Sequence, residues 1–167
     1  MKRRSFLQHG AVAAAAGALP FVFGRRSLAA GRPPLVPDPL GILDLPEGFA
    51  YRILDRQGDK MSDGYLTPGL PDGMGCFPRA DGKLVLMRNH ELQGEAANGP
   101  FFETQEKPPE MYDESTFGGV SRLVVDAKTL TRESSNLVLS GTTRNCSGGV
   151  SPWGWLTCEE TFSATHG

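Results

Sequence analysis

Every apolar run after residue 30 is short and is bounded by turn-forming residues. No stretch beyond that point has an apolar face at helical spacing over three turns, and the 167 residues include 21 glycines and 13 prolines. Runs of this length and type predict β-strands, and the many turn residues exclude a helix bundle. We therefore expect an all-β fold. The predicted strands cover residues 49–54, 84–87, 120–125, 137–139 and 153–158.

Two short polar segments between these runs have the composition of hairpin turns. Asp81-Gly82-Lys83 precedes the run at 84–87, and residues 126–129 follow the run at 120–125. Gly and Asp at such positions predict hairpin connections. Residues 94–116 are polar and contain three prolines, so they predict a long excursion. Loops of that length in a compact domain are usually functional or form interaction surfaces.

The first thirty residues have the composition of an export signal. Adjacent Arg3 and Arg4 precede Phe6-Leu7, an Ala-rich apolar stretch covers residues 11–23, and small residues lead to a predicted cleavage point after Ala29 or Ala30. This pattern predicts a twin-arginine signal peptide over residues 1–29, recognised by the twin-arginine translocation machinery. We expect the mature protein in the periplasm or secreted. It should have no stable membrane span after cleavage, because no apolar run reaches 18 residues.

Removal of this peptide leaves an acidic chain. Residues 1–29 contain five basic and no acidic side chains, so 12 basic and 19 acidic residues remain, a net charge of −7. This balance argues against nucleic acid as a partner. The periplasm is oxidising and supplies metal ions such as calcium, so both disulfides and metal sites are to be expected there.

The rest of the chain divides into a linker and a domain. Four prolines within residues 30–40 predict an extended Pro-rich linker, and residues 41–167 form the predicted domain. The sequence stops just after its final predicted strand, without an element that would close a sheet. Since an open sheet must cover its edges, we expect a partial β-propeller, that is, the first blades of a larger closed structure.

One polar cluster follows the apolar run at 84–87. Asn89, His90 and Glu91 come directly after Arg88, where oxygen and imidazole donors at a strand end can ligate a metal or orient a substrate. A solvated strand end is the alternative interpretation. No nucleophile elbow, phosphate-binding loop, zinc helix or EF-hand pattern is present to supply a different chemistry.

A second cluster surrounds one of the three cysteines. Cys146 follows Arg144 and Asn145 and precedes a Gly-Gly pair, where the backbone can approach an ion closely. Like Asn89, His90 and Glu91, Arg144 and Asn145 are candidates to contact the substrate or to support the metal ligands. The adjacent carboxylates Glu159 and Glu160 point to opposite faces if their strand continues, so one of them can share a site with Cys146. A thiolate ligand and a disulfide between Cys146 and Cys158 remain alternatives. The odd number of cysteines leaves at least one thiol free within the chain.

These motifs resemble the PhoX family of alkaline phosphatases, in that family's order. The most specific block joins Asn145-Cys146-Ser147-Gly148-Gly149 to Thr157-Cys158-Glu159-Glu160. The resemblance covers about residues 41–162 and includes the export peptide. The other segments that carry it are residues 41–49, 61–64, 71–75, 86–91, 116–119 and 139–144.

The resemblance implies a secreted, metal-dependent phosphomonoesterase on a β-propeller, with ferric iron and calcium ions at the mouth of its channel. It implies that Cys146 binds iron and that a Glu of the Cys-Glu-Glu motif is also a metal ligand. We assign this Glu to Glu160, with Glu159 as the alternative, because the segment at 153–155 is one residue shorter than the family pattern. Family members are several times longer, so these 167 residues correspond to an N-terminal part that lacks a complete site.

Physical considerations agree with this expectation. A phosphate monoester carries dense negative charge, and an acidic chain would repel it unless bound cations reversed the local field. Ferric iron accepts thiolate and carboxylate ligands, whereas calcium takes oxygen ligands only. The alternative function is an exported, non-catalytic β-propeller binding module, in which Cys146 pairs with Cys158. An electron-transfer carrier has no haem or Cys-x-x-Cys motif to support it.

Overall fold

A computed structural model describes residues 33–94, 99–100 and 107–161. The chain divides into two compact units, Met1–Tyr51 and Arg52–Gly167, and each is described by itself. Every regular element in the described residues is a β-strand, and all pairings are antiparallel. The predicted all-β class is therefore confirmed.

The first unit is organised around one carboxylate. Strand β1 (Leu35–Val36) pairs with β2 (Leu45–Pro46), so part of the predicted linker enters a short β-ladder. Between them, Asp38 accepts a hydrogen bond of 2.6 Å from the Tyr51 hydroxyl and three more from backbone amides of residues 40, 42 and 43. These donors hold the pKa of Asp38 well below its usual range.

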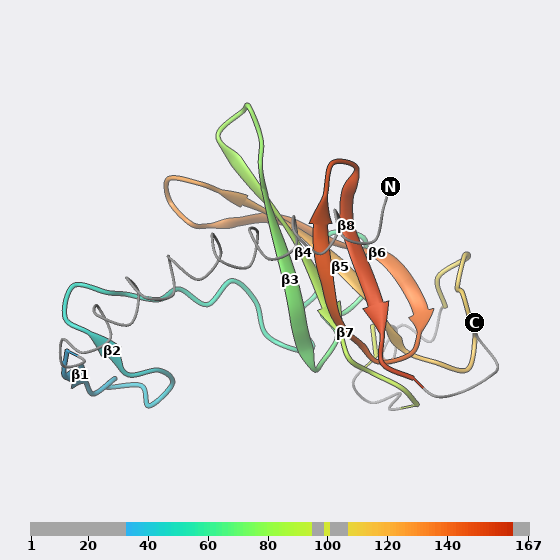
Figure 1. Ribbon diagram of the computed structural model, residues 1–167, viewed down its shortest axis with the longest axis horizontal. Coiled ribbons are helices and arrows are strands. Elements are labelled where there is room, and N and C mark those ends of the chain that lie inside the picture. The colour runs from blue at the N-terminus through green and yellow to red at the C-terminus, as the bar shows by residue number, and fades with distance from the viewer. Residues whose placement is uncertain (1–32, 95–98, 101–106, 162–167) are drawn as a thin grey trace, which may run out of the picture. The chain divides into compact units, whose positions relative to one another are not determined.

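The second unit contains a four-stranded sheet whose strands follow one another in chain order (Figure 1). Its strands are β3 (Pro71–Pro78), β4 (Lys83–His90), β5 (Gly118–Asp126) and β6 (Arg132–Thr142). The strand predictions at 84–87, 120–125 and 137–139 are confirmed, as are the turns that join β3 to β4 and β5 to β6. The strands are longer than predicted, because several of them continue through polar residues beyond the apolar runs. The apolar core of the sheet includes Val120, Leu123 and Val125 on β5, with Leu92 and Met61.

One predicted strand is absent. Residues 49–54 carry no regular structure, and the Phe49 side chain is 71% exposed. The run contains enough apolar residues for a strand, but no neighbouring strand pairs with it. The prediction was wrong because apolar content indicates a strand only where a partner is available.

The remaining strands form a separate hairpin. Strand β7 (Asn145–Ser151) pairs with β8 (Gly154–Glu159), which confirms the predicted strand at 153–158. Asn145 lies opposite Glu159 and Ser147 opposite Cys158, so Cys146 is an extra residue at a β-bulge. The hairpin lies against β3 and β4 (Figure 1).

Trp155 on β8 fills the space between the hairpin and the sheet. A Cβ added to Gly75 on β3 would lie 2.6 Å from the Trp155 ring, and one added to Gly148 on β7 would lie 2.7 Å from it. Real carbon atoms do not approach so closely, so both strands need glycine where the indole packs. Glycines that weaken a sequence-based strand prediction therefore make this packing possible.

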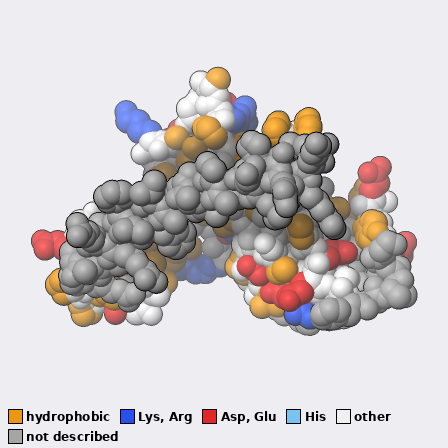
Figure 2. All heavy atoms as spheres, in the orientation of Figure 1, with side chains coloured by type: hydrophobic (Ala, Val, Ile, Leu, Met, Phe, Trp, Pro, Cys, Tyr) orange, Lys and Arg blue, Asp and Glu red, His pale blue; other side chains and the backbone are white. Residues whose placement is uncertain are grey.

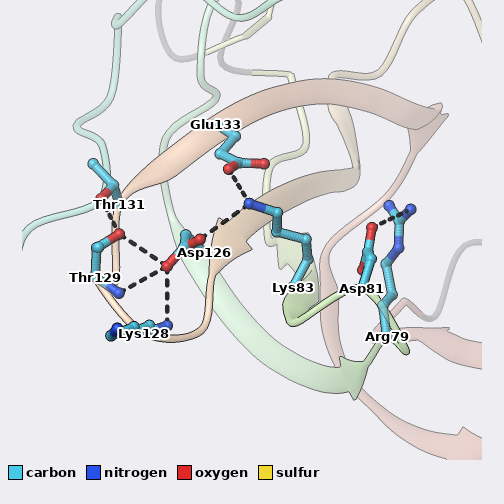
Figure 3. Close-up of polar contacts among 8 residues, drawn as sticks. All are labelled: Arg79, Asp81, Lys83, Asp126, Lys128, Thr129, Thr131 and Glu133. Atoms are coloured by element: carbon cyan, nitrogen blue, oxygen red, sulfur yellow. Dashed lines mark hydrogen bonds and ion pairs between the residues drawn. The ribbon is translucent and has the colours of Figure 1, made fainter.

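The turns at one end of the sheet are held by a charged cluster (Figure 3). Lys83 pairs with Asp126 at 3.0 Å and also with Glu133, and Asp126 accepts a 2.8 Å hydrogen bond from the Thr129 amide. The Thr129 amide and the Lys83 ammonium hold the pKa of Asp126 below its usual range. Because these side chains all bind one another or the turn backbone, we interpret the cluster as structural.

The outer edge of β6 is covered by loops. Ser62 donates its amide to the Ser135 carbonyl at 2.8 Å, and the amides of Tyr112 and Asp113 bond to the carbonyls of Ser140 and Gly141 at 3.0 and 2.9 Å. The described part of the long excursion, residues 94, 99–100 and 107–116, contains no helix or strand, and Tyr112 and Asp113 within it cover this edge. Such contacts block pairing with a foreign strand.

Candidate functional site

The candidate residues gather at the end of the sheet opposite the turn cluster. Strand β4 ends there, β7 begins there and β8 ends there. Acidic side chains also gather near this end on the face drawn in Figure 2. Topology thus brings the polar segments at 88–91, 142–149 and 157–160 to one region, although the first and last of them lie about 70 residues apart in the sequence.

Cys146 is held in place by its neighbours. As the bulge residue it has no ladder partner on β8, and its side chain is partly exposed. Gly73 on β3 approaches its backbone so closely that an added Cβ would lie 2.7 Å from the Cys146 oxygen. Cys76, Cys146 and Cys158 are all free thiols in the structure, so the disulfide alternative is not formed.

The two adjacent glutamates differ in their surroundings. Glu159 accepts a 2.6 Å hydrogen bond from the Thr143 amide. Alternation along β8 places Glu159 on the same face as Trp155 and Thr157, which face the sheet. Glu160 follows the end of the strand, is more exposed and lies 3.6 Å from the Arg144 guanidinium.

Arg144 lies between two carboxylates. Its backbone is fixed by a bond from its amide to the Leu92 carbonyl at 2.8 Å and by another from the Glu160 amide to its own carbonyl at 3.0 Å. It adopts a φ of 53°, in the left-handed region. Its Nη2 lies 3.3 Å from Glu91 and 3.6 Å from Glu160. The side chain lines a cavity of about 300 Å³ together with Leu70, Glu91 and Gln93.

Asn89 is completely buried and every polar atom of its side chain is used. Its Nδ2 donates to the Ser147 carbonyl, and its Oδ1 accepts from Trp155 Nε1 and Thr157 Oγ1, each at 2.9 Å. All three partners belong to the β7–β8 hairpin. Asn89 therefore joins the hairpin to β4 and does not present its amide to solvent.

Asn145 continues this network. It is also completely buried, its Oδ1 accepts a hydrogen bond from Thr142, and its Nδ2 donates to Thr157 Oγ1 at 2.9 Å. The Thr157 hydroxyl in turn donates to Asn89. The residues on both sides of Cys146 are thus attached to the interior by side-chain or backbone hydrogen bonds.

His90 lies on the opposite face of β4 and is also completely buried. Its Nδ1 lies 2.9 Å from the Gly69 carbonyl, which can only accept, so Nδ1 carries the proton. Its Nε2 then accepts from Ser121 Oγ at 2.8 Å. A Ser–His pair is a known nucleophile arrangement, but both residues are fully buried and no substrate can reach them.

The burial of His90 predicts acid-dependent stability. Burial lowers its pKa from 6.5 to about 4. The imidazole binds a proton near its ordinary pKa of 6.5 in the unfolded chain but only near pH 4 in the folded chain. The contribution of neutral His90 to the free energy of unfolding is therefore complete above pH 6.5 and is lost as the pH falls toward 4. In urea denaturation, the free energy of unfolding should be about 2–3 kcal/mol lower at pH 4.5 than at pH 7 because of this residue. His90→Gln should unfold with a weaker pH dependence by that amount; an equal dependence in both proteins would contradict the prediction.

Metal-ligating side chains are few at this end of the sheet. The described residues contain no group of three or more His, Cys, Asp or Glu side chains that could hold a metal ion. A thiol and a carboxylate suit ferric iron, but two protein donors are fewer than iron or calcium requires. The described residues therefore do not form a complete metal centre.

Several residues of this region were not predicted from the sequence. Gly73, Thr157 and Trp155 position the hairpin, and their roles depend on contacts with residues distant in the chain. The buried pair Asp55–Arg88, at 2.7 Å, lies beside His90 on the other face of β4. Within the described ranges no helix is long and apolar enough to cross a membrane.

Comparison with known proteins identifies two matches to family models. The model described as alkaline phosphatase PhoX matches residues 30–137 and 128–167. The model of the TAT (twin-arginine translocation) pathway signal sequence matches residues 1–20. No curated protein and no solved structure matches the chain.

Proposed function

Because the chain belongs to the PhoX family of alkaline phosphatases, we propose that it takes part in the hydrolysis of phosphate monoesters at alkaline pH. The family match, which covers residues 30–167, is the observation that carries this proposal. The twin-arginine signal directs the chain to export, into the periplasm or out of the cell. Its substrates are then phosphate monoesters outside the cytoplasm, and its export partner is the twin-arginine machinery.

PhoX proteins are metal-dependent phosphatases, and we propose ferric iron and calcium as the ions. Cys146 and Glu160, with Glu159 as the alternative, are the ligands that this chain would contribute. Two observations support them: the thiol is partly exposed, and it lies near the strand end that carries both glutamates. When bound, such cations offset the negative charge of the transferring phosphoryl group.

We propose Arg144 as the residue that orients the phosphate. Among the described residues, the contacts of Arg144 with Glu91 and Glu160 are made by its Nη2, at one side of the guanidinium. The guanidinium lines an open cavity, and its backbone is fixed on both sides. A planar cation with several N–H donors suits the oxygens of a phosphate group.

The strand order supports a β-propeller as the complete fold. Four antiparallel strands in chain order, followed by a separate antiparallel hairpin, match one blade and the beginning of the next. On this proposal residues 1–29 are the signal peptide, residues 30–40 the linker and residues 41–167 the first part of the propeller domain.

Replacing the proposed thiolate ligand tests the function. In a full-length PhoX phosphatase, the substitution equivalent to Cys146→Ser should abolish hydrolysis of p-nitrophenyl phosphate at alkaline pH and lower the bound iron, because a neutral hydroxyl does not replace thiolate on ferric iron. The exported protein is supplied with iron and calcium, and elemental analysis is made alongside the assay. Glu160→Gln should behave in the same way, because it retains the shape of the ligand and removes its charge.

Cys76→Ser is the matched control and should retain both properties, since Cys76 lies on β3 outside the candidate cluster. Unchanged hydrolysis and iron content in Cys146→Ser would refute the ligand assignment. Activity that survives exhaustive chelation would refute the metal-dependent function.

A further inference from the structure

The position of Cys146 depends on contacts outside its own ladder. It is the one residue of β7 that is inserted at the bulge, so β8 supplies no opposing residue for it. A bulged residue is set by the attachments of its neighbours, because the regular ladder is interrupted there. Those attachments are therefore the features that decide how the thiol is presented.

Asn89 supplies the attachment on one side. Its Nδ2 bonds to the Ser147 carbonyl at 2.9 Å, directly after Cys146. Its Oδ1 holds Trp155 and Thr157 on the opposing strand, also at 2.9 Å. One fully buried amide thus fixes both strands of the hairpin at the level of the bulge.

Gly73 supplies a second restraint. An added Cβ there would lie 2.7 Å from the Cys146 oxygen, 3.2 Å from the Ser147 Cα and 3.3 Å from Asn89 Nδ2. Strand β3 is itself irregular at this point, with a shift in pairing between Pro71 and Met74. The bulge therefore rests directly on the backbone of β3.

We propose that Asn89 and Gly73 are positioning residues for the Cys146 thiol. Asn89 attaches the backbone next to the thiol to β4, and Gly73 allows the bulge to approach β3. The proposal rests on the proposed function in one respect: Asn89 and Gly73 affect metal binding because Cys146 is the proposed ligand. Their effect on the position of the thiol does not depend on any metal.

The reactivity of the thiol provides the test. In a chain with Cys76→Ser and Cys158→Ser, Cys146 is the only thiol, and its alkylation by iodoacetamide is followed without metal. Asn89→Ala should raise the rate at least about ten-fold, because it removes three hydrogen bonds and the loss of any one of them contributes about a factor of five. Gly73→Ala should raise it as well, by displacing the bulge from β3.

His90→Gln is the matched control. It changes the next residue of the same strand and removes two buried hydrogen bonds, whose partners Gly69 and Ser121 lie outside the hairpin. We expect its alkylation rate to stay within two-fold of the parent under conditions where it is folded. A rate for Asn89→Ala within two-fold of the parent, or an equal increase in His90→Gln, would overturn the proposal.

A milder variant keeps the test decisive if Asn89→Ala does not fold. Thr157→Val removes the hydroxyl that joins Asn89 and Asn145 and retains the bond from Asn89 to Ser147. It should raise the alkylation rate by a factor of about three to five, as expected for part of the network. Unchanged rates in both Thr157→Val and Gly73→Ala would overturn the proposal.

Cobalt(II) serves as the metal probe in a second measurement. A thiolate–cobalt absorption band should appear with the parent and with His90→Gln, and should be weakened several-fold in Asn89→Ala. A parent chain without this band contradicts the proposed role of Cys146 as a metal ligand. In that case the alkylation rates still decide whether Asn89 and Gly73 position the thiol.

Discussion

Replacing Arg3 and Arg4 together by lysine should leave the precursor in the cytoplasm. The export machinery recognises the arginine pair, and residues 1–20 match the twin-arginine signal sequence. Lysine retains the charge and loses the planar guanidinium, so recognition by shape is lost while the charge pattern is unchanged. Cell fractionation followed by immunoblotting measures the precursor and the mature chain in each compartment, and we expect nearly complete loss of the mature form.

The matched control changes a second arginine pair in the same peptide. Arg25 and Arg26 lie near the predicted cleavage point, outside the matched segment. Their replacement by lysine should leave export intact. Undiminished delivery of the Arg3 and Arg4 variant would remove the twin-arginine assignment.

Asp55→Ala should lower the free energy of unfolding by about 3–5 kcal/mol, because it leaves a buried cation unpaired. Asp55 bonds to both terminal nitrogens of Arg88, at 2.7 and 3.0 Å, and its side chain is 3% exposed. Arg132 lies 3.5 Å from the same carboxylate. Urea denaturation of the parent and the variant at pH 7 measures the difference.

Asp81→Ala provides the comparison for this prediction. Asp81 pairs with Arg79 at 2.9 Å, but both side chains are about half exposed (Figure 3). Exposed pairs contribute between zero and about 1 kcal/mol, so this variant should unfold almost as the parent does. Similar losses in Asp55→Ala and Asp81→Ala would show that burial does not set the strength of the first pair.

The strands that could be predicted are those with the greatest apolar and β-branched content. Val120, Leu123 and Val125 give β5 a clear signal, and all three are buried in the core. The turn at Asp81-Gly82 fixes where β4 begins. In these segments local preference and tertiary packing favour the same structure, so the sequence alone is sufficient.

Strands β3 and β7 could not be predicted. Their glycines and prolines oppose a strand assignment when each segment is considered alone. They form strands because Trp155 packs against Gly75 and Gly148, and because Gly73 admits the bulge at Cys146. The contacts of Gly73 and Gly75 join residues about 70 to 80 positions apart, so their effect is absent from any local pattern.

The candidate site shows the same division. The polar run after the 84–87 strand lies at one end of the sheet, and Cys146, Glu159 and Glu160 lie at the same end. The sequence does not reveal that β4 continues through His90 and buries Asn89 and His90 completely. The metal-ligand roles of Cys146, Glu160 and Glu159 stay predictions.

The alternation of side chains along β4 has a consequence for misfolding. Arg88 and His90 point to one face, where Asp55, Ser121 and the Gly69 carbonyl receive them, and Asn89 points to the other. A slip of the strand by one residue would exchange the two faces, bringing a cation and an imidazole against the hairpin and leaving Asp55 without its partner. A one-residue slip would thus bury unsatisfied polar groups, and this penalty disfavours that misalignment during folding.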